Sequence, residues 1–171
     1  MDNAKLTFYE QRTIKWDPQR NSVVMIDQTL LPNELSFVEC FDVASVVDAI
    51  KTMKIRGAPA IGVAGAMGLA LSVVHSKART KNDLLRELEA DVIALKSARP
   101  TAVNLAWGVD ATVQYLIDTL PEEFEDTESA RVKTVEFVQA LADDDVRTNK
   151  KLSEYGAKLF RTGESVLTHC N

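Results

Sequence analysis

Residues 54–74 read KIRGAPAIGVAGAMGLALSVV, and this stretch decides the fold. From residue 58 to residue 74 the side chains are uncharged and mostly small. A helix that is apolar on every side is either buried in a core or spans a membrane, and a span needs about 20 such residues. The stretch is shorter than that, and Pro59 fits the first turn of a helix. We therefore predict a core helix that runs to about residue 76 and packs closely on its neighbours.

Before this helix, residues 5–40 predict a small sheet. Short runs of β-branched and aromatic residues, which favour strands, alternate with turn-forming segments. The runs are LTFYE (6–10), TIKWD (13–17), SVVMID (22–27) and LSFVEC (35–40), and the turns are PQRN (18–21) and LPNE (31–34). The pattern predicts a mostly antiparallel sheet.

Helical spacing of apolar residues dominates the rest of the chain. One helix is expected from about residue 43 to residue 54, with Asp42 at its positive N-terminus. Another begins at Thr80 or Asn82 as N-cap and ends near residue 98. A further helix covers about 101–120. Its expected apolar stripe consists of Val103, Ala106, Trp107, Val113, Leu116 and Leu120.

The last helix is expected over about 128–161. Its polar run ADDDVRTNKK (142–151) fits either a turn of this helix or a bend. The aspartates Asp143 to Asp145 do not match the spacing of a calcium loop, so they are interpreted as a solvated helix face.

Gly163 suits the end of the last helix, and the following residues change character. SVLTHCN (165–171) is apolar and β-branched, which is typical of strands buried on both faces of a parallel sheet. Such a sheet needs further strands. We interpret residues 1–163 as a sheet-plus-helical domain and residues 164–171 as the first strand of a truncated α/β domain. The fold class is α+β: a small N-terminal sheet followed by a helical bundle.

Composition and charge narrow the functional classes. With 171 residues, 46% hydrophobic and 26% charged, the chain resembles a folded globular protein with one core. A net charge of −5 argues against general binding to nucleic acid or to an anionic membrane. The two cysteines, Cys40 and Cys170, predict neither a disulfide framework nor a structural zinc site. We expect a cytoplasmic protein without a metal or another cofactor.

The start of the apolar helix has the features of a phosphate site. Gly57, Ala58 and Pro59 leave backbone N–H groups free at the positive end of the helix. Arg56 beside them can present a two-donor fork to an anion. The motif is neither a P-loop nor a GxGxxG fingerprint. A second interpretation fits as well, in which Gly57 caps the preceding helix and Arg56 is a surface charge.

A second arginine, Arg99, precedes Pro100 at the start of another predicted helix. Two arginines at helix N-termini can bind one phosphate if they converge in space. The alternative for Arg99 is a solvated residue at a helix end.

Cys170 stands at the carboxyl end of the last predicted strand, where α/β sheets bind their ligands. Its thiol is functional only if its surroundings lower its pKa or place it against a substrate; otherwise it is a small buried apolar group. His169 would point to the opposite face of the strand, so the two side chains are poor candidates for an activated pair.

Five segments together resemble methylthioribose-1-phosphate isomerase, a family of methionine salvage in the same superfamily as the regulatory subunits of translation initiation factor 2B. They are IDQTLLP (26–32), AIKTMKIRGAPAIGVAGAMG (49–68), ARPTAVNLAW (98–107), NKKLSEYGAKLF (149–160) and VLTHCN (166–171). They spread over nearly the whole chain, and the combination of RGAPAIG, RPTAVNL and THCN is highly specific.

The resemblance implies a longer protein whose second, Rossmann-like domain begins with the strand that carries the cysteine. It implies that the sugar phosphate is contacted by Arg56, Gly57, Ala58 and Arg99, mainly through its phosphate, and that Cys170 is the catalytic thiol. An aspartate, an asparagine and a lysine of the second domain would complete the site. The implied activity is an aldose–ketose isomerisation by a homodimer, and the 171-residue chain alone is expected to be inactive.

The resemblance is also compatible with two other functions. A noncatalytic regulatory subunit of the initiation factor 2B type would bind a protein partner or a nucleotide, although such subunits generally lack the complete set of motifs. A ribose-1,5-bisphosphate isomerase would act on a related sugar phosphate, and the RGAPAIGVAGAMG segment is less typical of it.

Overall fold

The computed structural model describes residues 11–124 and 127–169. Three short strands, β1 (Ile14–Asp17), β2 (Ser22–Ile26) and β3 (Phe37–Cys40), form an antiparallel sheet in the order β1-β2-β3. Trp16 pairs with Val23, which pairs in turn with Cys40. These three side chains belong to the buried core, so they mark the face of the sheet that packs on the helices. The run expected at 6–10 lies outside the described residues.

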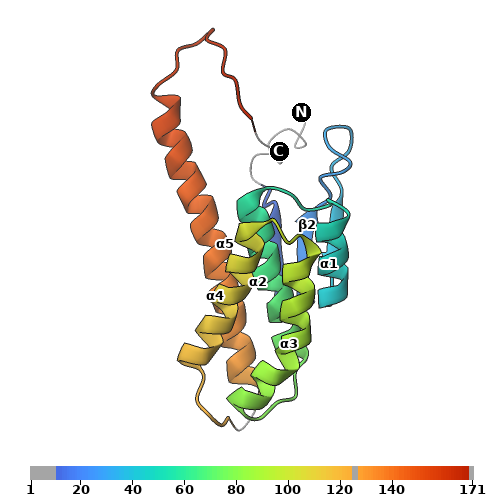
Figure 1. Cartoon of the computed structure of the whole chain (residues 1–171). Helices are drawn as coiled ribbons and strands as arrows, with labels where there is room; N and C mark the ends of the chain where they lie inside the picture. Colours follow the sequence, from blue (N-terminus) through green and yellow to red (C-terminus); the bar gives the residue numbers. More distant parts are fainter. Residues whose placement is uncertain (1–10, 125–126, 170–171) are drawn as a thin grey trace.

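In the described chain, five helices follow the sheet: α1 (Val43–Lys51), α2 (Ala58–His75), α3 (Lys81–Ala98), α4 (Val103–Thr119) and α5 (Glu128–Ala157). α2 is central, because it contacts every other helix as well as β1 and β2 (Figure 1). By length and composition α2 could cross a membrane, but 67% of it is buried inside the bundle. This burial confirms the predicted core helix. The order of the elements, three strands followed by helices, confirms the predicted α+β fold class.

α2 and α4 run parallel and touch through glycines. A Cβ atom on Gly108 would lie 2.1 Å from the carbonyl oxygen of Gly62, so the two backbones meet where no side chain fits. Gly62 also approaches Asn104, and Gly65, farther along α2, approaches Val109, farther along α4. The contacts advance in the same direction along both helices. Both helices therefore begin at the same end of the bundle, as Figure 1 shows.

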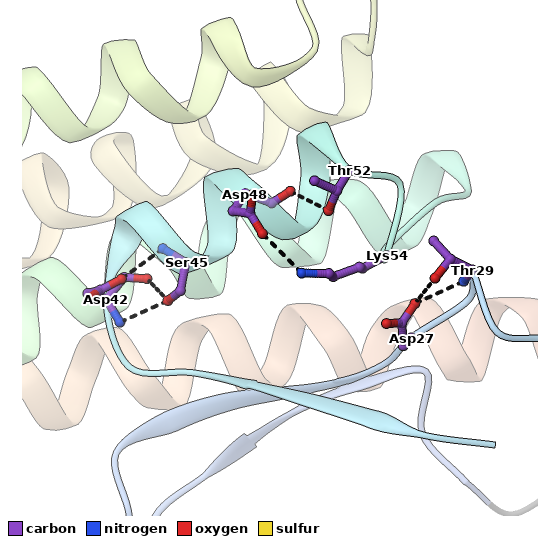
Figure 2. A network of polar contacts seen from close by, with 7 residues as sticks. All are labelled: Asp27, Thr29, Asp42, Ser45, Asp48, Thr52 and Lys54. Carbon is purple, nitrogen blue, oxygen red and sulfur yellow. Dashed lines mark hydrogen bonds and ion pairs between the residues drawn. The ribbon is translucent and has the colours of Figure 1, made fainter. Parts of the chain in front are cut away.

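A polar network fixes α1 and the chain beyond it (Figure 2). The Asp42 carboxylate accepts a 2.8 Å hydrogen bond from the Ser45 backbone N–H, and the Ser45 side chain completes a capping box. Beyond the far end of the helix, Lys54 Nζ lies 3.0 Å from Asp48 Oδ2. The expected place of Asp42 is confirmed. The helix ends sooner than expected, because Met53 adopts a φ of 66° that is incompatible with a helix.

The predicted apolar stripe of α4 is confirmed in the second half of the helix, where Leu116 and Leu120 are buried and Val113 packs on the core, and it is wrong in the first half. Val103 and Trp107 are 78% and 57% exposed, whereas Leu105 and Val109 are buried together with the correctly predicted Leu116. The close contact with α2 turns the glycine face of α4 inward. Residue spacing within α4 does not reveal which face a partner helix selects.

α5 is one continuous helix, so the polar run at 142–151 is helical and not a bend. Asp143 in this run lies 2.5 Å from Arg12, and Asp145 accepts a hydrogen bond from Asn149. The aspartates lie on a polar helix face, as predicted. Beyond Ala142 the helix has no buried residue among those described, and it projects past the other helices in Figure 1.

The strand expected at 164–171 is not formed in its described part. Residues 164–169 have no regular secondary structure and are exposed, with Leu167 98% exposed. A strand requires a hydrogen-bonded neighbour, and the three described strands pair only with one another. Residues 170 and 171 lie outside the described part, and the division into two domains stays a prediction.

Candidate functional site

The first element of the candidate site is the start of α2. Gly57 is its N-cap, with φ 92° and ψ 128°, in the region that favours glycine. It does not cap α1, which ends at Lys51 with Thr52 as its C-cap. No side chain caps the start of α2, and Pro59 stands in its first turn. The first N–H groups of α2 have no acceptor within the helix, so they are available to an anion.

Gln28 holds Arg56 beside this helix start. Its Nε2 donates to the Arg56 carbonyl oxygen at 3.1 Å, and Arg56 Nη2 donates to the Gln28 carbonyl oxygen at 3.4 Å. The Gln28 backbone N–H also donates to the Lys54 carbonyl oxygen at 2.8 Å. Sequence reasoning did not single out Gln28. Its partner is 28 residues away, and no spacing rule joins positions so distant.

Arg99 lies three residues before Ala102, the N-cap of α4, whereas Arg56 directly precedes the N-cap of α2. Arg99 is the C-cap residue of α3, and its carbonyl oxygen accepts a 2.9 Å hydrogen bond from the N–H of Ala102. Ala102 has no side chain that can cap, so α4 begins, like α2, without a side-chain cap. Each helix start is thus an open set of N–H donors with an arginine within four residues before it.

Both guanidinium groups keep a buried nitrogen without a partner. In the described part of the chain, such atoms among the side chains are Trp16 Nε1, Arg56 Nε, Arg99 Nη1 and Arg131 Nε. A buried donor without an acceptor is costly. Two of these four nitrogens belong to the arginines that precede α2 and α4. Since both helices begin at the same end of the bundle, an oxyanion bound there could supply acceptors to both arginines.

Two other ionisable groups of the domain, Cys40 and Lys54, do not add an anion-binding group. The Cys40 thiol is buried in the core, and burial raises its pKa, which keeps it protonated and unreactive. The Lys54 ammonium has a raised pKa because of its hydrogen bond to Asp48 and the charge of that residue. It is therefore a cation that already has an anionic partner.

The described structure places four of the five predicted site residues at the two helix starts: Arg56, Gly57 and Ala58 at α2, and Arg99 at α4. Cys170 lies outside the described residues. His169 is exposed and belongs to no strand. The roles of all five residues stay predictions.

The observed architecture is that of an α+β domain with a candidate phosphate site at two parallel helix starts. The chain belongs to the initiation factor 2 subunit family (IF-2B), whose model matches residues 54–171. This match contains the starts of both α2 and α4.

Several known proteins are similar to the chain. A putative methylthioribose-1-phosphate isomerase of Methanosarcina acetivorans is 44% identical over 160 residues, 94% of this chain and 44% of that protein. The crystal structure of 5-methylthioribose 1-phosphate isomerase from Pyrococcus horikoshii OT3 matches with a TM-score of 0.76 and 37% identity, over 87% of this chain and 40% of that one. A structure described as translation initiation factor eIF-2B, subunit delta, from A. fulgidus matches with a TM-score of 0.78 and 38% identity, over 94% and 45%. The chain spans less than half the length of these relatives.

Proposed function

We propose that this chain is the phosphate-binding part of a methylthioribose-1-phosphate isomerase, which converts 5-methylthioribose 1-phosphate into 5-methylthioribulose 1-phosphate. The observation that carries the proposal is that α2 and α4 begin at one end of the bundle without a side-chain cap, and that Arg56 and Arg99 precede these two starts. Similarity to two proteins named as such isomerases supports the choice of substrate.

A sugar phosphate suits this end of the bundle chemically. Its phosphate oxygens accept charge-assisted hydrogen bonds from guanidinium groups and hydrogen bonds from the first N–H groups of a helix. We assign the phosphate to Arg56 and Arg99, and to the backbone at Gly57 and Ala58. In this assignment Gln28 positions Arg56 without touching the substrate.

The isomerisation itself needs more than a phosphate site. The C1 hydroxyl of the substrate is esterified, so the sugar ring cannot open spontaneously to an aldehyde. The enzyme must open the ring with proton transfer while a hydrogen moves from C2 to C1. We assign the thiol of Cys170 to this step, opposite an acid or base in a pocket that excludes water. We propose that this second group lies in the part of the relatives that the chain does not span, since it covers 44% of the isomerase from Methanosarcina acetivorans.

Phosphate binding tests the site without turnover. Inorganic phosphate is titrated into the 171-residue chain by calorimetry. We expect Arg56→Ala and Arg99→Ala each to weaken binding at least about tenfold, because each removes a charge-assisted hydrogen bond. Arg86→Ala is the control, since Arg86 is an exposed arginine whose partner is Asp83. Equal affinities in the original chain and in both site variants would contradict the proposal.

Turnover tests the reaction. Conversion of 5-methylthioribose 1-phosphate is measured with the 171-residue chain and with a chain that continues through a second domain. We expect product only from the longer chain, and Cys170→Ala should abolish it there. Turnover by the short chain would refute the need for a second domain.

A noncatalytic subunit of the initiation factor 2B type is the second candidate, favoured by the match to the A. fulgidus protein at a TM-score of 0.78. It predicts binding to a protein or a nucleotide and no isomerisation by the longer chain. A ribose-1,5-bisphosphate isomerase is distinguished by comparing the rates on both sugar phosphates. For the longer protein we also propose a cytoplasmic homodimer, which sedimentation analysis and cell fractionation test.

A further inference from the structure

Asn104 lies in the first turn of α4, on the face that packs against α2. The helix begins at Val103, and Asn104 is four residues before Gly108, so the two share one face. A Cβ atom on Gly62 of α2 would lie 2.9 Å from the Asn104 carbonyl oxygen and 3.5 Å from the Asn104 Cβ atom. The Asn104 side chain therefore leaves α4 in the seam between the two helices.

The first turn of α2 offers two free N–H donors near this seam. Ile61 donates to the carbonyl oxygen of Gly57, the N-cap, at 2.9 Å. The residues between them have no acceptor within the helix, and Pro59 has no N–H. Ala58 and Ala60 are thus the donors that α2 presents to an anion.

Helix geometry brings the Asn104 amide close to these donors. Gly62, which contacts Asn104, is four residues beyond Ala58, or about 6 Å along the axis. Cβ atoms tilt toward the N-terminus of their helix, and α2 and α4 begin at the same end of the bundle. The Asn104 side chain therefore starts about one turn from the free donors of α2 and leans toward them.

The Asn104 amide is accessible to a ligand. Asn104 is half-buried, and its side chain makes no hydrogen bond to the described residues. In this part of the chain, the fully buried side-chain atoms that lack a partner belong to tryptophan and arginine. The amide of Asn104 is not one of them, so it keeps contact with solvent.

An amide suits a hydroxyl group. Its NH₂ donates and its carbonyl oxygen accepts, and a hydroxyl group can do both in return. In a sugar 1-phosphate, the hydroxyl group nearest to the phosphate is the one on C2. After the isomerisation C2 carries a carbonyl oxygen, which can still accept a hydrogen bond from the NH₂ group.

We infer that the Asn104 amide binds the C2 hydroxyl group of the sugar phosphate, while the helix starts and their arginines bind the phosphate. The inference rests on the proposed function, which places the phosphate at this end of the bundle. It makes Asn104 a specificity-determining residue, because inorganic phosphate and 2-deoxy sugars lack the group that it recognises.

The experiment compares ribose 1-phosphate with 2-deoxyribose 1-phosphate, which differ only in the C2 hydroxyl group. Both are titrated into the 171-residue chain by calorimetry, with inorganic phosphate as the third ligand. We expect the original chain to bind ribose 1-phosphate about fivefold more tightly than the deoxy sugar, the effect of one hydrogen bond. Asn104→Ala should abolish this difference and leave the affinity for inorganic phosphate unchanged.

The substitution keeps the fold intact, because alanine retains the Cβ atom beside Gly62 and favours a helix. Urea unfolding verifies this. Asn149→Ala is the matched control, since Asn149 is exposed on α5 and bonds to Asp145; it should keep the preference for ribose 1-phosphate.

The outcomes separate this inference from the proposed function. Equal affinity of the original chain for both sugars, or a preference that persists in Asn104→Ala, overturns the role of Asn104 and leaves the phosphate site standing. Weaker binding of inorganic phosphate by Asn104→Ala would also overturn it, because Asn104 would then act on the phosphate. If none of the three ligands binds, the proposed phosphate site is refuted and this inference with it.

Discussion

Gln28 and Arg56 hydrogen-bond to each other in both directions: the Gln28 side chain donates to the Arg56 backbone at 3.1 Å, and the Arg56 side chain donates to the Gln28 backbone at 3.4 Å. The pair joins the segment after β2 to the residue that precedes the N-cap of α2. A free arginine side chain loses up to about 2 kcal/mol of conformational entropy when it is ordered. Gln28 removes part of this cost before an anion binds.

Gln28→Ala should therefore weaken phosphate binding without removing a group that touches the anion. The substitution removes the hydrogen bond to the Arg56 carbonyl oxygen but keeps the backbone acceptor of the Arg56 side chain. The effect is therefore at most that of one neutral hydrogen bond, about 1 kcal/mol or about fivefold in affinity. Titration calorimetry with inorganic phosphate measures the effect. Gln114→Ala is the control, because Gln114 bonds only to the exposed Asp118 on α4. An affinity equal to that of the original chain would mean that Gln28 does not position Arg56.

Gly57→Ala should destabilise the chain through the backbone alone. A Cβ atom at Gly57 would meet no atom within 4 Å, but its φ of 92° strains any residue with a side chain. Such strain costs on the order of 1–3 kcal/mol. We expect a loss of this size in the free energy of unfolding by urea, and weaker phosphate binding because the start of α2 shifts.

Gly156→Ala is the matched control for this change. Its Cβ atom also meets nothing within 4 Å, but Gly156 is the last residue but one of α5 and has an ordinary φ. Alanine is favoured over glycine by about 1 kcal/mol inside a helix, so at this helix end the variant should gain less than that and lose nothing. If both variants changed stability in the same direction, the positive φ of Gly57 would not explain the stability lost in Gly57→Ala.

Gly108→Ala tests whether the contact between α2 and α4 sets the candidate site. Its Cβ atom would lie 2.1 Å from the Gly62 carbonyl oxygen, and backbone atoms cannot yield as a side chain does. The helices must separate at a cost of roughly 1–3 kcal/mol or more. Because Arg56 and Arg99 precede these two helices, phosphate affinity should fall as well. Calorimetry below the unfolding temperature measures the phosphate affinity of the folded variant apart from its loss of stability. An affinity equal to that of the original chain would show that the contact between the helices does not shape the site.

Local signals in the sequence were sufficient to predict the order and type of the described elements. Asp42 stands at the N-terminus of α1 as predicted, and of the two candidates for the N-cap of α3, Thr80 and Asn82, the structure selects Thr80. Such signals are local, because a cap is decided by hydrogen bonds within one turn. The phase of α4 was not predictable from its own spacing. Val103 and Trp107 look like core residues, but the neighbouring α2 selects the face that carries Gly108.

The candidate site was predictable only in part, because its geometry also depends on contacts between elements that are distant in sequence. The residue types around Gly57 and the place of Arg99 before a helix pointed to an anion. A site shared by both arginines requires that α2 and α4 begin at the same end of the bundle, which follows from the close approach of Gly62 to Gly108 and of Gly65 to Val109. The unpartnered nitrogen of Arg56 and its hydrogen bonds to Gln28 are properties of tertiary packing, and no pattern within one segment encodes them.

The Asp42 cap should make stability depend on pH in a defined direction. Hydrogen bonds from the backbone and side chain of Ser45 lower the pKa of Asp42 below its ordinary value of 3.8. A carboxyl with a lower pKa in the folded state stabilises the fold above its unfolded pKa, and this contribution disappears as the pH falls through the folded value. At pH 7, Asp42→Ala should cost about 1 kcal/mol. The difference from the original chain should shrink below about pH 4.

Asp42→Asn separates the hydrogen bond from the charge. Asparagine also caps helices well but does not titrate, so this variant should keep most of the stability at pH 7. Between about pH 5 and pH 3, the original chain should lose roughly 0.5 kcal/mol more than the variant, a small amount because Asp42 is exposed and its charge is screened by water. Urea unfolding at a series of pH values measures both curves. Parallel curves for the two proteins would mean that the carboxylate charge contributes nothing and that the cap acts through its hydrogen bond alone.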